Sequence, residues 1–200
     1  MEELRPGLWT WTAPHPSWTP EADGWDQVVR SYALDAGDSL VLLDPLVEVA
    51  DVEELADRRP VVVILTCHWH RRSAPELVQA LDAVVHAPPT QTREIEIATI
   101  PYQVGDDLPG DVEPQPGGYS DECTLWLREH AALVTGDVFL GGSQGFHVQP
   151  DSWLADGFTH ESLREQLAPL VELPVEMLLP THGDPILEGA HEALEHALDS

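Results

Sequence analysis

Short apolar runs alternate along the chain with segments in which apolar residues recur at helical spacing. Alternation of apolar and polar residues predicts a strand over residues 7–14, and the continuous apolar run over 61–66 predicts a strand buried on both faces. Apolar positions three and four apart predict a helix over 46–59. We therefore expect two β-rich halves with helices outside them, in a single domain that spans residues 1–200.

Polar residues and prolines mark the ends of two further predicted helices. Ser73 is the expected N-cap of a helix over 73–82. Thr159 is the expected N-cap of a helix over 160–173, which Pro169 bends or ends. A weaker alternation predicts a strand over 94–100. The long segments between these elements are rich in Pro and Gly, and we expect them to form the loops that decide substrate specificity.

The charge of the chain narrows the choice of partners. It carries a formal net charge of −27, from 36 acidic residues and nine basic ones, all of which are Arg. Such a surface repels nucleic acid and anionic membranes, and no run approaches the roughly 18 apolar residues of a membrane span. Two cysteines and the lack of a recognisable secretion signal favour the cytoplasm. We expect a small-molecule substrate or ligand, while the oligomeric state stays open.

Metal-capable side chains follow four of the apolar runs. These are Asp44, the pair His68 and His70, Asp137 and His182. Side chains at strand ends are held rigidly and can converge. Imidazoles and carboxylates together suit zinc, iron or manganese. These side chains are therefore candidates for a metal site.

The direction of the two neighbouring histidines depends on the local backbone. If residues 68–70 are extended, His68 and His70 point the same way and can chelate one ion, while Trp69 points away. Glu122 or His147 could complete the site, although both also read as ordinary loop residues.

Four longer segments occur in a characteristic order. They read "SYALDAGDSLVLLDPL", "VVVILTCHWH", "PGGYSDECTLWLREHAALVTGDVF" and "LLPTHGDP". Together they resemble the metallo-β-lactamase superfamily, with its H-x-H-x-D-H signature, its segment from G-H-T to T-G-D, and its terminal P-G-H-G. The resemblance implies an α+β fold: a four-layer αββα sandwich in which two mixed β-sheets pack face to face with helices outside.

The chain departs from the pattern of that superfamily at three metal-ligand positions. Arg72 stands where the signature Asp belongs, Ser73 where its last His belongs, and Gly118 where the G-H-T His belongs. A permanent cation at position 72 would repel a second ion by several kcal/mol at about 4 Å and an effective dielectric near 20. We therefore expect at most one ion, most readily zinc, with iron or manganese as alternatives. The resemblance implies that His68, His70, Asp137 and His182 hold it. In a second possible register, Cys67 and Trp69 take the two His positions.

Two hypotheses of different classes follow. In the first, the protein is a divergent hydrolase that attacks a small ester, thioester, lactone or amide-like bond with metal-bound hydroxide. In the second, it binds no metal and is not catalytic, because Arg72 replaces the ion through a bidentate pair with Asp137 and the pocket binds a ligand or partner. A third hypothesis, which the resemblance suggests because some members of the superfamily carry iron, is an oxidoreductase accessory. Beside the metal ligands, the residues expected to line the pocket are Asp44, Trp69, Arg72, Gly118 and His147.

Overall fold

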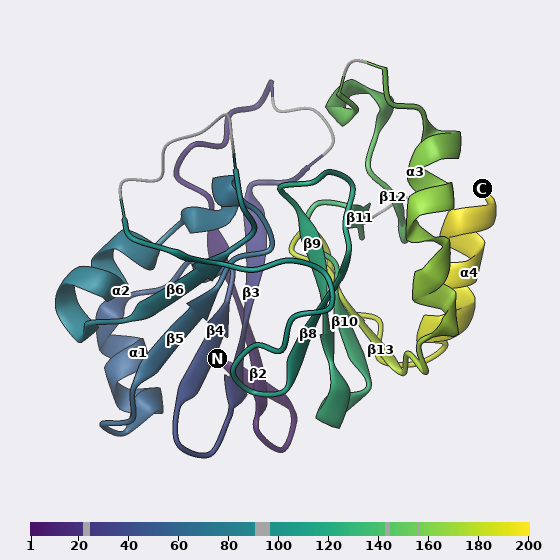
Figure 1. Ribbon diagram of the computed structural model, residues 1–200. Coiled ribbons are helices and arrows are strands. Elements are labelled where there is room, and N and C mark those ends of the chain that lie inside the picture. Colours follow the sequence, from purple (N-terminus) through teal and green to yellow (C-terminus); the bar gives the residue numbers. More distant parts are fainter. Residues whose placement is uncertain (22–24, 91–96, 143–144, 156) are drawn as a thin grey trace.

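The computed structural model describes residues 1–21, 25–90, 97–142, 145–155 and 157–200. Within these residues, two β-sheets lie face to face in the middle of the molecule, as Figure 1 shows, and helices cover the outer face of each. The first sheet has the strand order β1-β2-β3-β4-β5-β6-β7, and the second has the order β13-β10-β9-β8. The αββα sandwich expected from the sequence is confirmed.

The bounds of the elements are as follows. The strands of the first sheet are β1 (Glu2–Arg5), β2 (Leu8–Pro14), β3 (Val28–Asp35), β4 (Leu40–Leu43), β5 (Val61–Ile64), β6 (Val84–Ala87) and β7 (Ile100–Pro101). Those of the second are β8 (Val112–Pro116), β9 (Cys123–Leu127), β10 (Ala132–Val134) and β13 (Met177–Leu179), and the pair β11 (Phe139–Leu140) and β12 (His147–Val148) is separate. The helices are α1 (Val49–Ala56), α2 (Ala74–Leu81), α3 (His160–Leu167) and α4 (Ala190–Asp199), and the 3-10 turns are η1 (His68–Arg71), η2 (Arg128–His130), η3 (Asp151–Trp153) and η4 (Ala168–Glu172).

The side chains of β4 show how the layers are held together. Leu40 and Leu42 pack into the core under α1 and α2, whereas Val41 and Leu43 pack into the core between the two sheets. All four are fully buried, as expected when successive side chains of a strand point to opposite faces. Burial of each such side chain is worth about 1.5–3 kcal/mol. A third core lies between the second sheet and the helices α3 and α4.

The helix ends follow the sequence signals in part. Thr159 caps α3 in a reciprocal box with Ser162, as expected. The helix ends at Leu167, just before Pro169, which has no N–H to continue the hydrogen-bond ladder and was expected to bend or end the helix. Ser73 occupies the N-cap position of α2, but its hydroxyl accepts a hydrogen bond from the N–H of Val47 and does not cap the helix.

Two features at the sheet edges complete the fold. The strand β1 was not anticipated, and it pairs antiparallel with β2. The strand expected over 94–100 lies partly outside the described residues, and β7 begins only at Ile100. Among the described residues, every helix is too short or too polar to cross a lipid bilayer.

Candidate metal centre

The site forms where parallel strands end. β4 runs parallel to β5, and β10 runs parallel to β13. Parallel strands end at a common edge of their sheet, so the residues that follow them gather there. Asp44 follows β4, His70 follows β5, Asp137 follows β10 and His182 follows β13. Hydrogen bonds and ion pairs link all four side chains in one buried cluster.

His70 lies between two carboxylates. Its Nδ1 is 2.8 Å from Oδ2 of Asp44, and its Nε2 is 2.9 Å from Oδ1 of Asp137. Burial disfavours the imidazolium, but Asp137, Cys67 and Asp44 together raise the pKa of His70 well above its ordinary value. The two carboxylates therefore favour the positively charged form of His70.

Asp137 is the common acceptor of the cluster. Its Oδ1 is also 3.0 Å from Nε2 of His182, and its Oδ2 accepts a hydrogen bond from the indole N–H of Trp69 at 2.5 Å. Burial opposes ionisation of this carboxyl, but His70 and the hydrogen bond from His182 hold its pKa well below the ordinary value. Asp137 is therefore a carboxylate that three ring systems hold in place.

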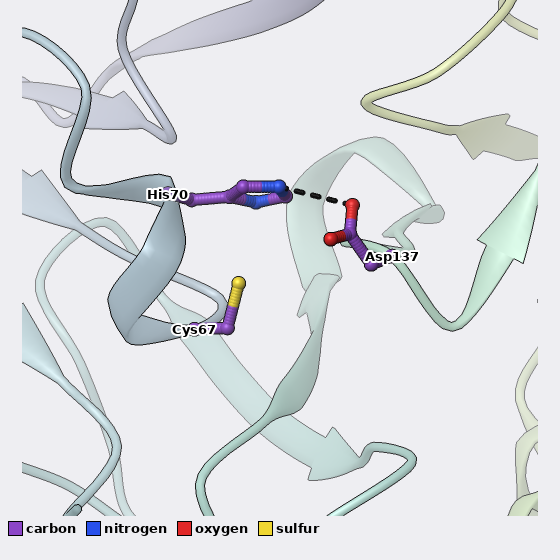
Figure 2. Close-up of side chains that lie close together, drawn as sticks. All are labelled: Cys67, His70 and Asp137. Carbon is purple, nitrogen blue, oxygen red and sulfur yellow. Dashed lines mark ion pairs between the residues drawn. The ribbon is translucent and has the colours of Figure 1, made fainter. Parts of the chain in front are cut away.

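Cys67 supplies a third potential ligand. Figure 2 shows its sulfur directed into the space beside the His70–Asp137 pair. One ligand atom each from Cys67, His70 and Asp137 lies within 4.8 Å of the other two, and all three residues are buried. Burial raises the pKa of the Cys67 thiol to about 12, so a bound cation is needed to ionise it near neutral pH.

A large open cavity leads to this cluster. Its volume is about 1210 Å³, and Trp69, His70, Arg72, Asp137 and His182 are part of its wall. Several other residues line it that were not expected there from the sequence: Trp25, Tyr119, Gln149, Trp153 and Phe158. Nothing in the local sequence pattern marks these side chains, because they come together only through the fold.

Comparison with solved structures finds other proteins with the same fold. The metallo-beta-lactamase family protein TTHA1429 from Thermus thermophilus superimposes with a TM-score of 0.69 and 17% identity, over 98% of this chain and 80% of that one. TTHA1623, solved in a di-iron-bound form, gives 0.65 and 23%, over 84% of this chain and 93% of that one. FIM-1 from Pseudomonas aeruginosa, solved in a mono-zinc form, gives 0.70 and 12%, over 98% of this chain and 92% of that one. The protein has the metallo-β-lactamase fold.

Sequence comparison adds no further assignment. No protein-family model matches the chain, and no curated protein matches it. At identities between 12% and 23% the structural likeness establishes the fold. The chemistry of the site depends on the residues that this chain places there.

The first departure from the expected site concerns the segment after β5. Residues 68–71 form the 3-10 turn η1 and are not extended. Trp69 consequently points toward Asp137, and the expectation that it points away is wrong. His68 is buried, but it is not among the described residues that line the cavity. Of the two neighbouring histidines, only His70 meets Asp137, and Cys67 takes the place beside it.

Arg72 does not make the expected pair with Asp137. Its Nη1 donates to the backbone carbonyl oxygens of Arg30, at 2.9 Å, and Asp44, at 2.8 Å. The imidazoles of His70 and His182 occupy the acceptor positions of Asp137 instead. The guanidinium nevertheless forms part of the cavity wall, so a permanent cation does lie in this region of the fold.

The remaining pocket candidates lie outside the cavity wall of the described residues. Asp44 is fully buried and acts from behind His70. His147 lies on β12, and its Nδ1 is 3.0 Å from the carbonyl oxygen of Gly145. At Gly118, the backbone N–H donates to Oε2 of Glu122, and an added Cβ would lie 2.7 Å from that oxygen. The carboxyl of Glu122 thus fills the space that a side chain at position 118 would need.

Proposed function

We propose that the protein is a metal-dependent hydrolase that binds one divalent ion through Cys67, His70 and Asp137, with His182 beside them. The contact between His70 and Asp44 carries this proposal. A metal-binding histidine characteristically donates its second ring N–H to a carboxylate, which fixes the ring and its tautomer. Here Nδ1 of His70 faces Asp44, and Nε2 is left to face Asp137 and the cavity.

The donor atoms suit zinc. Thiolate, imidazole and carboxylate are the ligands that zinc takes in proteins, at about 2.0–2.3 Å from the ion. Two ligands of a tetrahedral ion are then about 3.3 Å or more apart. The separations of 2.9 and 3.0 Å from Asp137 to His70 and His182 need to lengthen by only a few tenths of an ångström.

Arg72 supports a single ion. Its guanidinium lines the cavity beside the cluster and cannot lose its charge near neutral pH. Two positive centres about 4 Å apart repel by several kcal/mol even at an effective dielectric near 20. The chain also has no histidine at position 118 to help hold a second ion.

The site suits hydrolysis of a small acyl compound. A bound ion would polarise an acyl carbonyl and lower the pKa of a coordinated water. The indole of Trp69 and the imidazole of His182 keep the carboxylate of Asp137 in one orientation. The cavity admits a small ester, thioester, lactone or amide. The two free, buried thiols fit a reducing compartment, and we place the protein in the cytoplasm.

Hydrolysis of a panel of esters, thioesters and lactones tests this function. The protein is assayed after chelation and again after zinc is restored. We expect activity only with the ion, and we expect Asp137→Asn to abolish it. His196→Ala, which alters an exposed histidine on α4, serves as the control and should keep full activity. Equal activity with and without the ion would contradict the proposal.

A ligand-binding protein without metal is the second candidate. The ion pairs of the cluster favour it, because the charged form of His70 would offset part of the charge of Asp44 and Asp137 without an ion. In that case chelation would change neither the unfolding temperature nor ligand affinity. The same chelated and zinc-restored samples distinguish the two candidates.

A further inference from the structure

The cavity over the cluster has an aromatic wall. Trp25, Trp69, Tyr119, Trp153 and Phe158 all line it, and they come from separate parts of the chain. The indole N–H of Trp69 is already bonded to Asp137, so this side chain offers the cavity its ring and no free donor. Aromatic side chains of this size bind flat rings by stacking and by edge-to-face contacts.

Two of the indoles flank the reacting end of the cavity. The ring centroid of Trp25 is 5.3 Å from that of His182, and the centroid of Trp153 is 6.2 Å from it. Both indoles stand edge-to-face with the imidazole. Any compound that reaches Asp137 beside His182 therefore comes into contact with an indole.

The hydroxyl of Tyr119 holds the segment that carries Trp153. It donates to the carbonyl oxygen of Trp153 at 2.9 Å, and it accepts from the N–H of Ala155 at 2.8 Å and from Nε2 of Gln149 at 3.1 Å. Its ring packs edge-to-face on Phe158 at 5.2 Å. Four contacts from one side chain fix this part of the aromatic wall in place.

A cation lies in the same cavity. The hydrogen bonds of Nη1 of Arg72 go to neutral carbonyl oxygens of Arg30 and Asp44, so they leave its charge uncompensated. His15 lines the same cavity, and burial and then the charge of Arg72 lower its pKa. An anionic group on a ligand would compensate this charge.

We propose that the cavity selects flat aromatic compounds that carry an anionic group, with the ring against Trp25 and Trp153 and the anion beside Arg72. In this arrangement Tyr119 is a positioning residue, because its hydroxyl places Trp153. As a statement about substrate, the inference rests on the proposed hydrolase function. As a statement about binding, it stands independently of turnover and of metal.

Calorimetric titration of metal-free protein tests the proposal, because an unreactive acid then has no ion to bind. The probes are naphthoate, cyclohexylacetate, which has the charge without the flat ring, and naphthylmethanol, which has the ring without the charge. We expect naphthoate to bind at least about ten times more tightly than either of the others. Equal affinity for naphthoate and cyclohexylacetate would overturn the aromatic part, and equal affinity for naphthoate and naphthylmethanol would overturn the role of Arg72.

Variants locate the ring. Trp153→Ala should weaken naphthoate binding about tenfold and leave cyclohexylacetate almost unchanged. Tyr119→Phe, which keeps the ring and removes the hydroxyl, should weaken naphthoate in the same direction. Trp11→Phe is the matched control, since Trp11 packs on the outer face of the first sheet, and it should have no effect. Unchanged naphthoate affinity in both cavity variants would contradict the proposal.

The binding experiments can succeed or fail independently of the hydrolysis assay that tests the proposed function. Selective binding of naphthoate by a protein that shows no metal-dependent hydrolysis would uphold the binding inference and remove the hydrolase. Metal-dependent hydrolysis without any preference for aromatic acids would do the reverse.

Discussion

The carboxylate of Asp44 accepts a hydrogen bond from Nδ1 of His70 at 2.8 Å, and this contact leaves Nε2 of the ring facing Asp137. Asp44 is itself fixed by the N–H of Thr66 at 2.8 Å and by the Thr66 hydroxyl at 2.6 Å. The orientation of His70 therefore depends on a carboxylate that does not reach the cavity. Its contribution to metal binding can be measured separately.

Asp44→Asn should weaken zinc binding by about 10–100-fold, because the amide is a poorer acceptor for the ring N–H. Asn tolerates the left-handed backbone of this position, where φ is +46°, so the substitution preserves the turn. Competition with a chromophoric chelator measures the affinity. Asp51→Asn on the exposed surface of α1 is the control. Equal zinc affinity in Asp44→Asn and the unaltered protein would show that Asp44 does not support a metal ligand.

Gly118 and Glu122 should prove energetically coupled. Gly118→Ala is expected to destabilise the fold by about 1–3 kcal/mol, because the new methyl would lie 2.7 Å from Oε2 of Glu122. In the double variant with Glu122→Ala this cost should largely disappear. Urea unfolding of the two single variants and the double variant gives the coupling energy. Strictly additive losses would mean that the Glu122 carboxyl does not occupy this space.

Glu122 should also make stability depend on pH. Burial, assisted by the charge of Asp137, raises the pKa of its carboxyl to about 8. The folded state then keeps a proton that the unfolded chain has lost, so the contribution is fully present below the ordinary pKa of a glutamate. Stability should decline as pH rises from about 5 through about 8, by a few kcal/mol at most.

Glu122→Gln should remove most of this decline, since an amide does not titrate. Urea unfolding at a series of pH values from weakly acidic to weakly alkaline measures it. Glu165→Gln, at an exposed position of α3, should keep the slope of the unaltered protein. A slope that persists in Glu122→Gln would assign it to another group.

Much of the fold could be predicted because its signals are local. The apolar run over 61–66 predicts a strand buried on both faces, and the side chains of β5 within it pack alternately into the two cores on either side of the first sheet. The positions of polar residues after such strands also follow from the sequence, since parallel strands end at a common edge. The polar residues that follow the four strands could therefore be expected to lie in one cluster.

The directions of the side chains could not be predicted in the same way. The conformation of η1 decides whether His68 or Cys67 lies beside His70 in the cluster. In this turn Trp69 contacts Asp137, and His70 contacts Asp44. Asp44 and Asp137 are distant from the turn in sequence, so the local spacing of apolar and polar residues cannot predict these contacts. The aromatic wall is also nonlocal, because Tyr119 holds Trp153 across a long separation in the chain.

The metal content of the purified protein tests the central claim most directly. Protein is prepared without an affinity metal or a chelator, reconstituted with zinc, and analysed by mass spectrometry beside Cys67→Ser, His70→Ala and His68→Ala. The account predicts about one ion per chain, lost or strongly reduced in Cys67→Ser and His70→Ala and retained in His68→Ala. No bound ion in the unaltered protein, or loss in His68→Ala with retention in Cys67→Ser, would contradict the assigned ligands.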